Sequence, residues 1–148
     1  MTLVVLLQDT RVKIRQKQFD AFSPKNDGEV IDFIIKHLQE ESPELIDRIP
    51  LDGLREMVGN GIARARSHSL GSLADLTGFV SIMFEIAPNF DVIPAIRRVL
   101  RDESAPPDKR FSMLFEKELD EAWERAANNF NAETWAEAWF PELRDEQE

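Results

Sequence analysis

Apolar residues recur every three or four positions along most of the chain, and Pro, Gly, Ser or Asn interrupt this pattern at intervals. Such spacing places apolar side chains on one face of a helix, so the pattern predicts an all-α fold. We expect helices over residues 12–22, 28–41, 51–68 and 72–87, a short helix opening at Pro94, a long helix from Phe111 to Phe130, and a last helix after Asn131 that contains Trp135 and Trp139.

The segment from 72 to 87 differs from the others because apolar residues surround it on nearly all sides. A helix with no polar face must be covered by other elements. The sequence therefore predicts a compact bundle of about six to seven helices packed around this central helix. Its apolar residues are Leu73, Leu76, Phe79, Val80, Ile82, Met83, Phe84 and Ile86.

Glycines mark two features of the predicted bundle. Gly59 and Gly61 lie inside the helix over 51–68, where each costs up to about 1 kcal/mol relative to Ala. This cost suggests a compensation, most simply the close crossing of a second helix. We expect Gly71 to end the following turn and Ser72 to cap the central helix.

The two ends of the chain are less regular than its middle. We treat residues 1–148 as one domain, with an N-terminal arm over 1–11 and a polar tail over 141–148. The apolar run Leu3–Leu7 fits a strand, an extended arm or a turn of helix. It is too short for a signal peptide or a membrane span. Residues 102–108, with two prolines, resemble a linker.

Composition narrows the class of protein. Hydrophobic residues make up 43% of the chain and charged residues 31%, which is typical of a globular protein. Cysteine is absent, which excludes disulfides, zinc–thiolate sites and thiol nucleophiles. We expect a cytoplasmic protein.

The net charge of −10 is unevenly distributed. Residues 1–24 carry +2, residues 25–115 carry −4 and residues 116–148 carry −8. An acidic surface repels the phosphates of nucleic acids and attracts basic proteins. The charge favours a basic protein partner over nucleic acid or membrane, although it is also typical of a solvated helix face.

Candidate chemistry is sparse. The histidines are His37, which we interpret as a surface helix residue, and His68, which we interpret as a cation favoured at a helix end. Neither has a second histidine at metal-binding spacing. We expect no catalytic residue, cofactor or metal. The many acids leave open a carboxylate-dependent enzyme, which the sequence does not support further.

Two groups of residues are candidate surfaces. The first is a basic patch, if its two helices are neighbours; pairing of these arginines with acids of the same molecule is the alternative. The second combines tryptophans with acids near the C-terminus, a common interface composition, although tryptophans also dock a last helix. The patch would contain Arg64, Arg66, Arg97, Arg98 and Arg101, and the second surface Trp123, Glu133, Trp135, Glu137 and Trp139.

Three segments in the first two thirds of the chain resemble a known family. They are Ile14–Phe19, Gly61–His68, and Ala87–Asp91 followed by Pro94. Together they resemble an uncharacterised bacterial family of small helical proteins, often encoded near type VI secretion spike and effector genes. The chain departs from the family pattern after His68, where the family has an aromatic residue and then glycine. The resemblance implies an accessory role beside secreted toxins, as an adaptor, chaperone or immunity protein, and it carries over no catalytic residue.

These observations favour a non-enzymatic accessory or adaptor protein of a bacterial secretion or toxin locus. Its expected partner is a protein, basic in charge, such as a secreted effector or a secretion component. An immunity protein that neutralises a cognate toxin is the alternative. We expect Asp91 and Pro94 to begin the helix at residue 94, and function to lie in surface residues.

Overall fold

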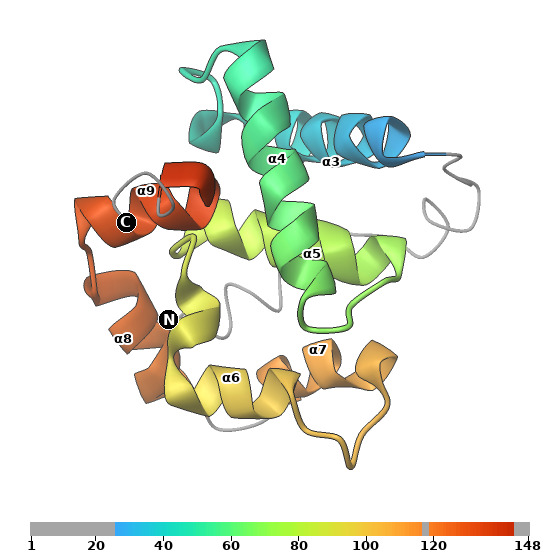
Figure 1. The fold of residues 1–148 in the computed structure, drawn as a ribbon, viewed down its shortest axis with the longest axis vertical. Helices are drawn as coiled ribbons and strands as arrows, with labels where there is room; N and C mark the ends of the chain where they lie inside the picture. Colours follow the sequence, from blue (N-terminus) through green and yellow to red (C-terminus); the bar gives the residue numbers. More distant parts are fainter. Residues whose placement is uncertain (1–25, 117–118, 144–148) are drawn as a thin grey trace.

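The computed structural model describes residues 26–116 and 119–143, which form seven α-helices and no strand (Figure 1). The expected all-α fold is confirmed over this part of the chain. The arm over 1–11, the helix over 12–22 and most of the tail lie outside it. The elements are α3 (Asp27–Glu41), η1 (Pro43–Leu45), α4 (Leu51–Arg66), α5 (Leu73–Glu85), η2 (Phe90–Val92), α6 (Pro94–Leu100), α7 (Pro107–Glu116), α8 (Asp120–Asn128) and α9 (Ala132–Trp139).

Helix α5 is the centre of the bundle, as the sequence predicts. Every residue from 75 to 83 is buried, including Thr77 and Ser81. Helix α4 crosses α5 and α3 packs beside both, while α6, α7 and α8 lie on the other side of the molecule (Figure 1). Burial on all sides explains why α5 has no polar stripe.

The expected close crossing at the glycines of α4 is also present. A Cβ atom on Gly61 would lie 3.1 Å from both Val80 Cγ2 and Met83 Sδ of α5. Gly59 approaches Ile31 of α3, with 3.4 Å between its would-be Cβ and Ile31 Cδ1. Gly61 therefore lets α4 lie close to α5, whereas a methyl group on Gly59 would make an ordinary van der Waals contact with α3.

The turn between α4 and α5 differs from the prediction. Ser69, not Gly71, is in the left-handed region, with φ of 67°. The backbone N–H groups of Ser69 and Leu70 bond back to Arg66 and Ala65, which satisfies carbonyls at the end of α4. Ser72 caps α5 as expected, because its hydroxyl oxygen accepts a hydrogen bond from Asp75 N at 3.1 Å.

The long helix expected from Phe111 to Phe130 is instead two helices, α7 and α8. Leu119 precedes α8 with φ of −115°, outside helical values. Residues eight apart in one straight helix lie about 12 Å apart along its axis. The break lets the rings of Phe115 and Trp123 stack with centroids 6.2 Å apart. Asn131 caps α9, as predicted.

Candidate functional site

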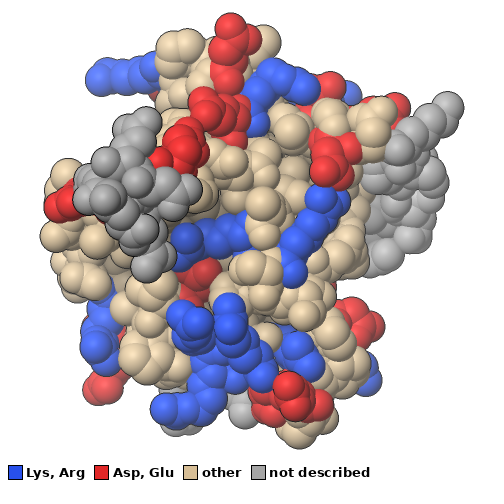
Figure 2. All heavy atoms as spheres, in the orientation of Figure 1, with Lys and Arg blue, Asp and Glu red and all other residues tan. Residues whose placement is uncertain are grey.

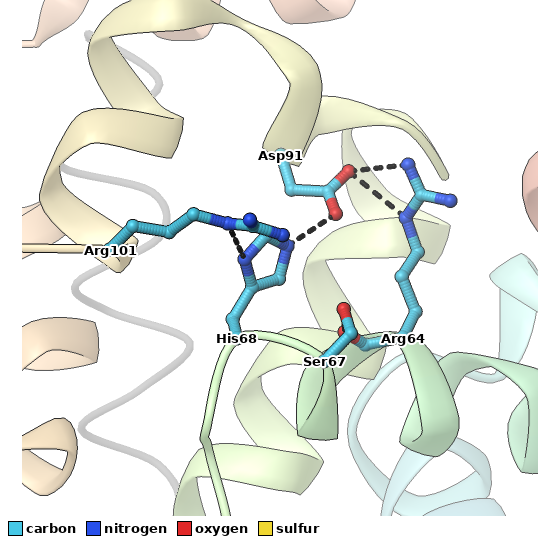
Figure 3. A network of polar contacts seen from close by, with 5 residues as sticks. All are labelled: Arg64, Ser67, His68, Asp91 and Arg101. Carbon is cyan, nitrogen blue, oxygen red and sulfur yellow. Dashed lines mark hydrogen bonds and ion pairs between the residues drawn. The ribbon is translucent and has the colours of Figure 1, made fainter.

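Four polar side chains from separate elements meet beside the end of α4 (Figure 3). Arg64 lies in the last turn of α4 and His68 in the turn that follows. Asp91 belongs to η2, and Arg101 follows α6. We call these four residues the His68 cluster.

Asp91 is the centre of the His68 cluster. Its Oδ1 atom accepts hydrogen bonds from Arg64 Nε at 3.0 Å and Nη2 at 2.7 Å. Its Oδ2 atom lies 2.7 Å from Nε2 of His68. Both carboxylate oxygens are therefore engaged. Asp91 is only 4% exposed, so these bonds replace its hydration.

The partners of His68 indicate its tautomer. Arg101 Nε donates to His68 Nδ1 at 3.3 Å, so Nδ1 must carry a lone pair. We therefore assign a ring proton to Nε2, which donates it to Asp91. His68 therefore links a buried carboxylate to an arginine whose side chain reaches the surface.

Two opposing effects act on the Asp91 carboxyl. Burial raises its pKa, whereas the hydrogen bond from His68 and the charge and hydrogen bonds of Arg64 lower it. The lowering effects are larger, so the pKa of Asp91 lies below its ordinary value. The carboxylate is therefore ionised at neutral pH despite its burial.

Aromatic rings support the cluster from the core side. The His68 ring lies 5.8 Å from that of Phe79, which packs 4.8 Å from Phe90. Phe90 in turn stacks on Trp123 at 5.7 Å. This row of rings holds the buried side of the imidazole in place, and it connects the cluster to α5 and α8.

The arrangement orients side chains and contains no paired nucleophile and base. Ser67 is adjacent to His68 in sequence, but its hydroxyl donates to the Arg64 carbonyl oxygen at 2.5 Å (Figure 3). Both nitrogens of His68 are engaged with Asp91 and Arg101. Within residues 26–116 and 119–143, no three His, Asp or Glu side chains gather as metal ligands.

Two sequence interpretations of these residues are wrong. His68 is 4% exposed and pairs with Asp91, so it does not act as an exposed cation at the end of α4. Asp91 does not cap α6, whose N-cap is Ile93 without a side-chain hydrogen bond. Residues 23 positions apart form this pair, and no local pattern indicates it.

His37 also differs from its interpretation as a surface residue. It is 7% exposed on α3, where it shares the inner face with Ile34 and Leu38. Burial lowers its pKa, and the nearby charges of Glu41 and Glu40 oppose this effect only in part. A histidine on the inner helical stripe is therefore part of the core.

The structure divides the arginines of the predicted basic patch. The His68–Asp91 pair brings Arg64 and Arg101 to one place. Arg66 points elsewhere, because residues two apart on a helix face different ways, and it pairs with Asp27 at 3.0 Å. That hydrogen bond lowers the pKa of Asp27 and raises that of Arg66. Arg97 and Arg98 are exposed on α6.

The predicted tryptophan surface is wrong in part. Trp123 is fully buried and Trp139 is 9% exposed, so neither indole can anchor a partner. Trp139 packs on Phe84 with ring centroids 4.5 Å apart, and Asn60 donates to its carbonyl oxygen at 2.7 Å. Trp135 is half-buried. Of the acids, Glu133 is exposed and Glu137 partly so.

Phe130 is a large apolar residue at the surface. The sequence predicted it as the last residue of a long helix, but α8 ends at Asn128 and Phe130 is 66% exposed. Its ring meets that of Trp135 edge to face at 4.7 Å. Asn128 and Asn129, just before it, border a shallow depression of about 290 Å³. The asparagine-rich stretch 128–131 was the available signal of a helix end.

No family model, curated protein or solved structure matches this chain. The resemblance of its three segments to a secretion-associated family therefore remains a prediction. Among the described residues, no helix has both the length and the apolar character needed to cross a bilayer.

Proposed function

We propose that this protein is a non-enzymatic adaptor that holds a basic partner protein through the exposed residues of α8, α9 and the loop between them. We call these residues the α8–α9 surface. The observation that carries the proposal is Phe130, an aromatic side chain 66% exposed in the most acidic part of the chain. Residues 119–143 contain six acids and one base.

The composition of the α8–α9 surface supports a protein partner. Covering a phenylalanine ring removes apolar area worth roughly 1.5–3 kcal/mol from water. The edge-to-face contact with Trp135 holds the Phe130 ring, so less conformational entropy is lost on binding. An aromatic anchor with a charged rim is the common arrangement of binding hot spots.

Charge supports a basic partner in particular. The acids of this surface include Asp120, Glu121 and Glu124 on α8, which are all exposed. They would steer a basic protein toward Phe130 and raise the association rate more than the affinity. The resemblance to a family encoded near secretion genes supports a secreted effector or a secretion component as that partner.

The His68 cluster supports a non-enzymatic role. Its four side chains bond to one another, and both nitrogens of the imidazole are engaged. A general base needs a nitrogen within reach of a substrate proton. The cluster is arranged as a structural support for arginines, which is the role we develop below.

The test is capture of the partner with matched variants. The tagged protein, Phe130→Ala and Leu51→Ala would each be used to pull proteins from the native host, followed by mass spectrometry. Leu51 is 59% exposed on α4 and serves as the control. We expect a basic protein whose capture falls at least about tenfold for Phe130→Ala, the size of a modest hot spot, and is unchanged for Leu51→Ala.

Two results would contradict this assignment. Equal capture of the same protein by both variants would remove the α8–α9 surface from the interaction. Rescue of growth from a co-expressed neighbouring toxin would identify an immunity protein instead of an adaptor. Thermal melts followed by circular dichroism would show that each variant remains folded.

A further inference from the structure

A second surface, opposite in charge to the first, lies where α6 follows η2. We call Arg64, Val92, Arg97, Arg98 and Arg101 the arginine surface. Val92 is 43% exposed, and the three arginines of this region, Arg97, Arg98 and Arg101, are also exposed. Figure 2 shows Lys and Arg side chains gathered where α6 lies in Figure 1.

Arg97 and Arg98 have no charged partner among residues 26–116 and 119–143. Neither side chain forms a hydrogen bond or an ion pair with any residue that the structure describes. By contrast, Arg55 and Arg66 on α4 pair with Asp32 and Asp27. In a chain with a net charge of −10, two consecutive exposed arginines without a partner among the described residues favour an anionic partner.

The two other arginines of this surface are held in place from beneath. Arg64 is bound by Asp91, and Arg101 is bound by His68, while Asp91 and His68 are each 4% exposed. A buried charge network adds little stability over apolar residues of similar volume. The network does fix two guanidinium groups, which prepares them to bind without further loss of side-chain entropy.

Both fixed guanidinium groups retain donors for a ligand. A guanidinium has five N–H donors. The hydrogen bonds of the cluster use one donor of Arg101, at Nε, and two of Arg64, at Nε and Nη2. The terminal N–H groups of Arg101 therefore remain for an acceptor, and they have the fork geometry that matches a carboxylate.

We propose that the arginine surface is a second interaction site, which binds an acidic segment of a partner protein. Carboxylates would accept from Arg97, Arg98 and Arg101, and an apolar side chain of the segment would cover Val92. A protein segment fits better than a nucleic acid, because Val92, which is 43% exposed beside the arginines, offers an apolar contact that a phosphate backbone does not use. With two surfaces of opposite charge, the protein would bridge two partners.

The test uses a fluorescein-labelled octaglutamate peptide as the probe and the full chain as the receptor, with binding followed by fluorescence anisotropy. The double variant Arg97→Gln/Arg98→Gln is compared with Arg55→Gln/Arg66→Gln, which changes the net charge equally. Loss of two charge-assisted contacts should weaken binding about tenfold in the first variant. Long-range charge alone should change it less than about twofold in the second at 0.15 M salt.

The supporting role of His68 is tested separately with His68→Gln. Its amide nitrogen can still donate to Asp91, but its one acceptor, the carbonyl oxygen, sits on a flexible chain and does not replace the fixed ring position of Nδ1 that holds Arg101. We expect the peptide affinity to fall about threefold, since one rotamer-rich side chain is released, while the thermal midpoint of the folded variant stays within a few degrees. Phe130→Ala should leave peptide binding unchanged, which separates this site from the α8–α9 surface.

Three outcomes would overturn the proposal. If both double variants lost the same peptide affinity, the binding would depend on net charge alone and not on the arginine surface. Tighter binding of an octathymidylate probe than of octaglutamate, lost in Arg97→Gln/Arg98→Gln, would make the surface a nucleic-acid site. A dimer in sedimentation that dissociates in the same variant would identify a second copy of this chain as the occupant.

Discussion

At the scale of single residues, Asp91 combines a buried carboxylate with three close hydrogen-bond donors. A carboxylate at 4% exposure stays ionised only if nearby donors replace its water. Arg64 and His68 supply three such contacts, all between 2.7 and 3.0 Å. Because the pKa of Asp91 is lower in the folded protein than its ordinary 3.8, ionisation of this group stabilises the fold.

We therefore expect Asp91→Asn to lower the free energy of unfolding at pH 7 by about 3 kcal/mol, since it leaves Arg64 without its buried partner. The contribution of Asp91 is fully present above about pH 5, where the carboxyl is also ionised in the unfolded chain, and is lost as the pH falls through 3.8 to its lowered pKa. The difference in free energy of unfolding between the wild type and Asp91→Asn should therefore become smaller below pH 4. Urea unfolding at pH 7, 4 and 3 measures it.

Asp32→Asn provides the control for this experiment, because Asp32 pairs with Arg55 on the surface, where its side chain is 65% exposed. An exposed pair contributes at most about 1 kcal/mol. Burial lowers the pKa of His37, so protonation of this residue at low pH also reduces stability, but by the same amount in the wild type and in both variants. A gap of the same size at pH 7 and pH 3 would contradict the role of the Asp91 charge.

At the scale of elements, two glycines set how closely the helices approach α5. Because Gly61 has no side chain, Val80 and Met83 of α5 pack directly against the backbone of α4. Gly78, on α5 itself, faces α7, where a Cβ atom would lie 2.7 Å from Cε2 of Phe111. Since real Cβ atoms do not approach that closely, the packing of α7 on α5 depends on the missing side chain.

Gly78→Ala should therefore destabilise the protein by about 1–3 kcal/mol through overpacking, although alanine favours helix formation. The matched control is Gly53→Ala on α4, where no atom lies within 4 Å of the added methyl group. There we expect a gain of up to about 1 kcal/mol. Urea midpoints of both variants, measured together, separate the two effects. A stabilising Gly78→Ala would show that α7 can move away from α5.

At the scale of the whole molecule, the C-terminal helices α8 and α9 contribute tryptophans to the core and acidic side chains to the surface. Helix α9 turns Trp139 inward onto Phe84, and Asn60 of α4 bonds to its backbone. The acids of α8 and α9 remain largely exposed. Helices α8 and α9 are thus attached to the bundle by their tryptophans, while Asp120, Glu121 and Glu124 of α8 remain exposed.

Deletion of residues 131–148 should consequently destabilise the fold, and not only weaken binding. Removing a buried tryptophan alone costs about 3–5 kcal/mol. We expect a clear fall in the thermal midpoint by circular dichroism. Deletion of residues 144–148 is the control, because it leaves the Trp139 contacts intact. An unchanged midpoint for the longer deletion would place α9 outside the cooperative unit.

Much of the fold follows from local patterns in the sequence. The burial of α5, the approach of helices at Gly61, and the caps at Ser72 and Asn131 were all predictable. The burial of α5 and the two caps depend on residues within one or two helical turns, where periodicity and capping chemistry act directly, and the approach at Gly61 was indicated by a glycine inside a helix. The break between α7 and α8 was missed because no proline or glycine marks it.

The candidate sites were decided by tertiary structure. His68 and Asp91 meet only because η2 packs against the end of α4, and Phe130 leaves the apolar stripe only because α8 ends two residues earlier. The sequence predicted Trp123 and Trp139 as part of a partner surface, but the packing of α8 and α9 buries both. By itself, the sequence determined helical periodicity and the sign of each charge. Which side chains meet depends on contacts between residues distant along the chain, and these arise only when the helices pack.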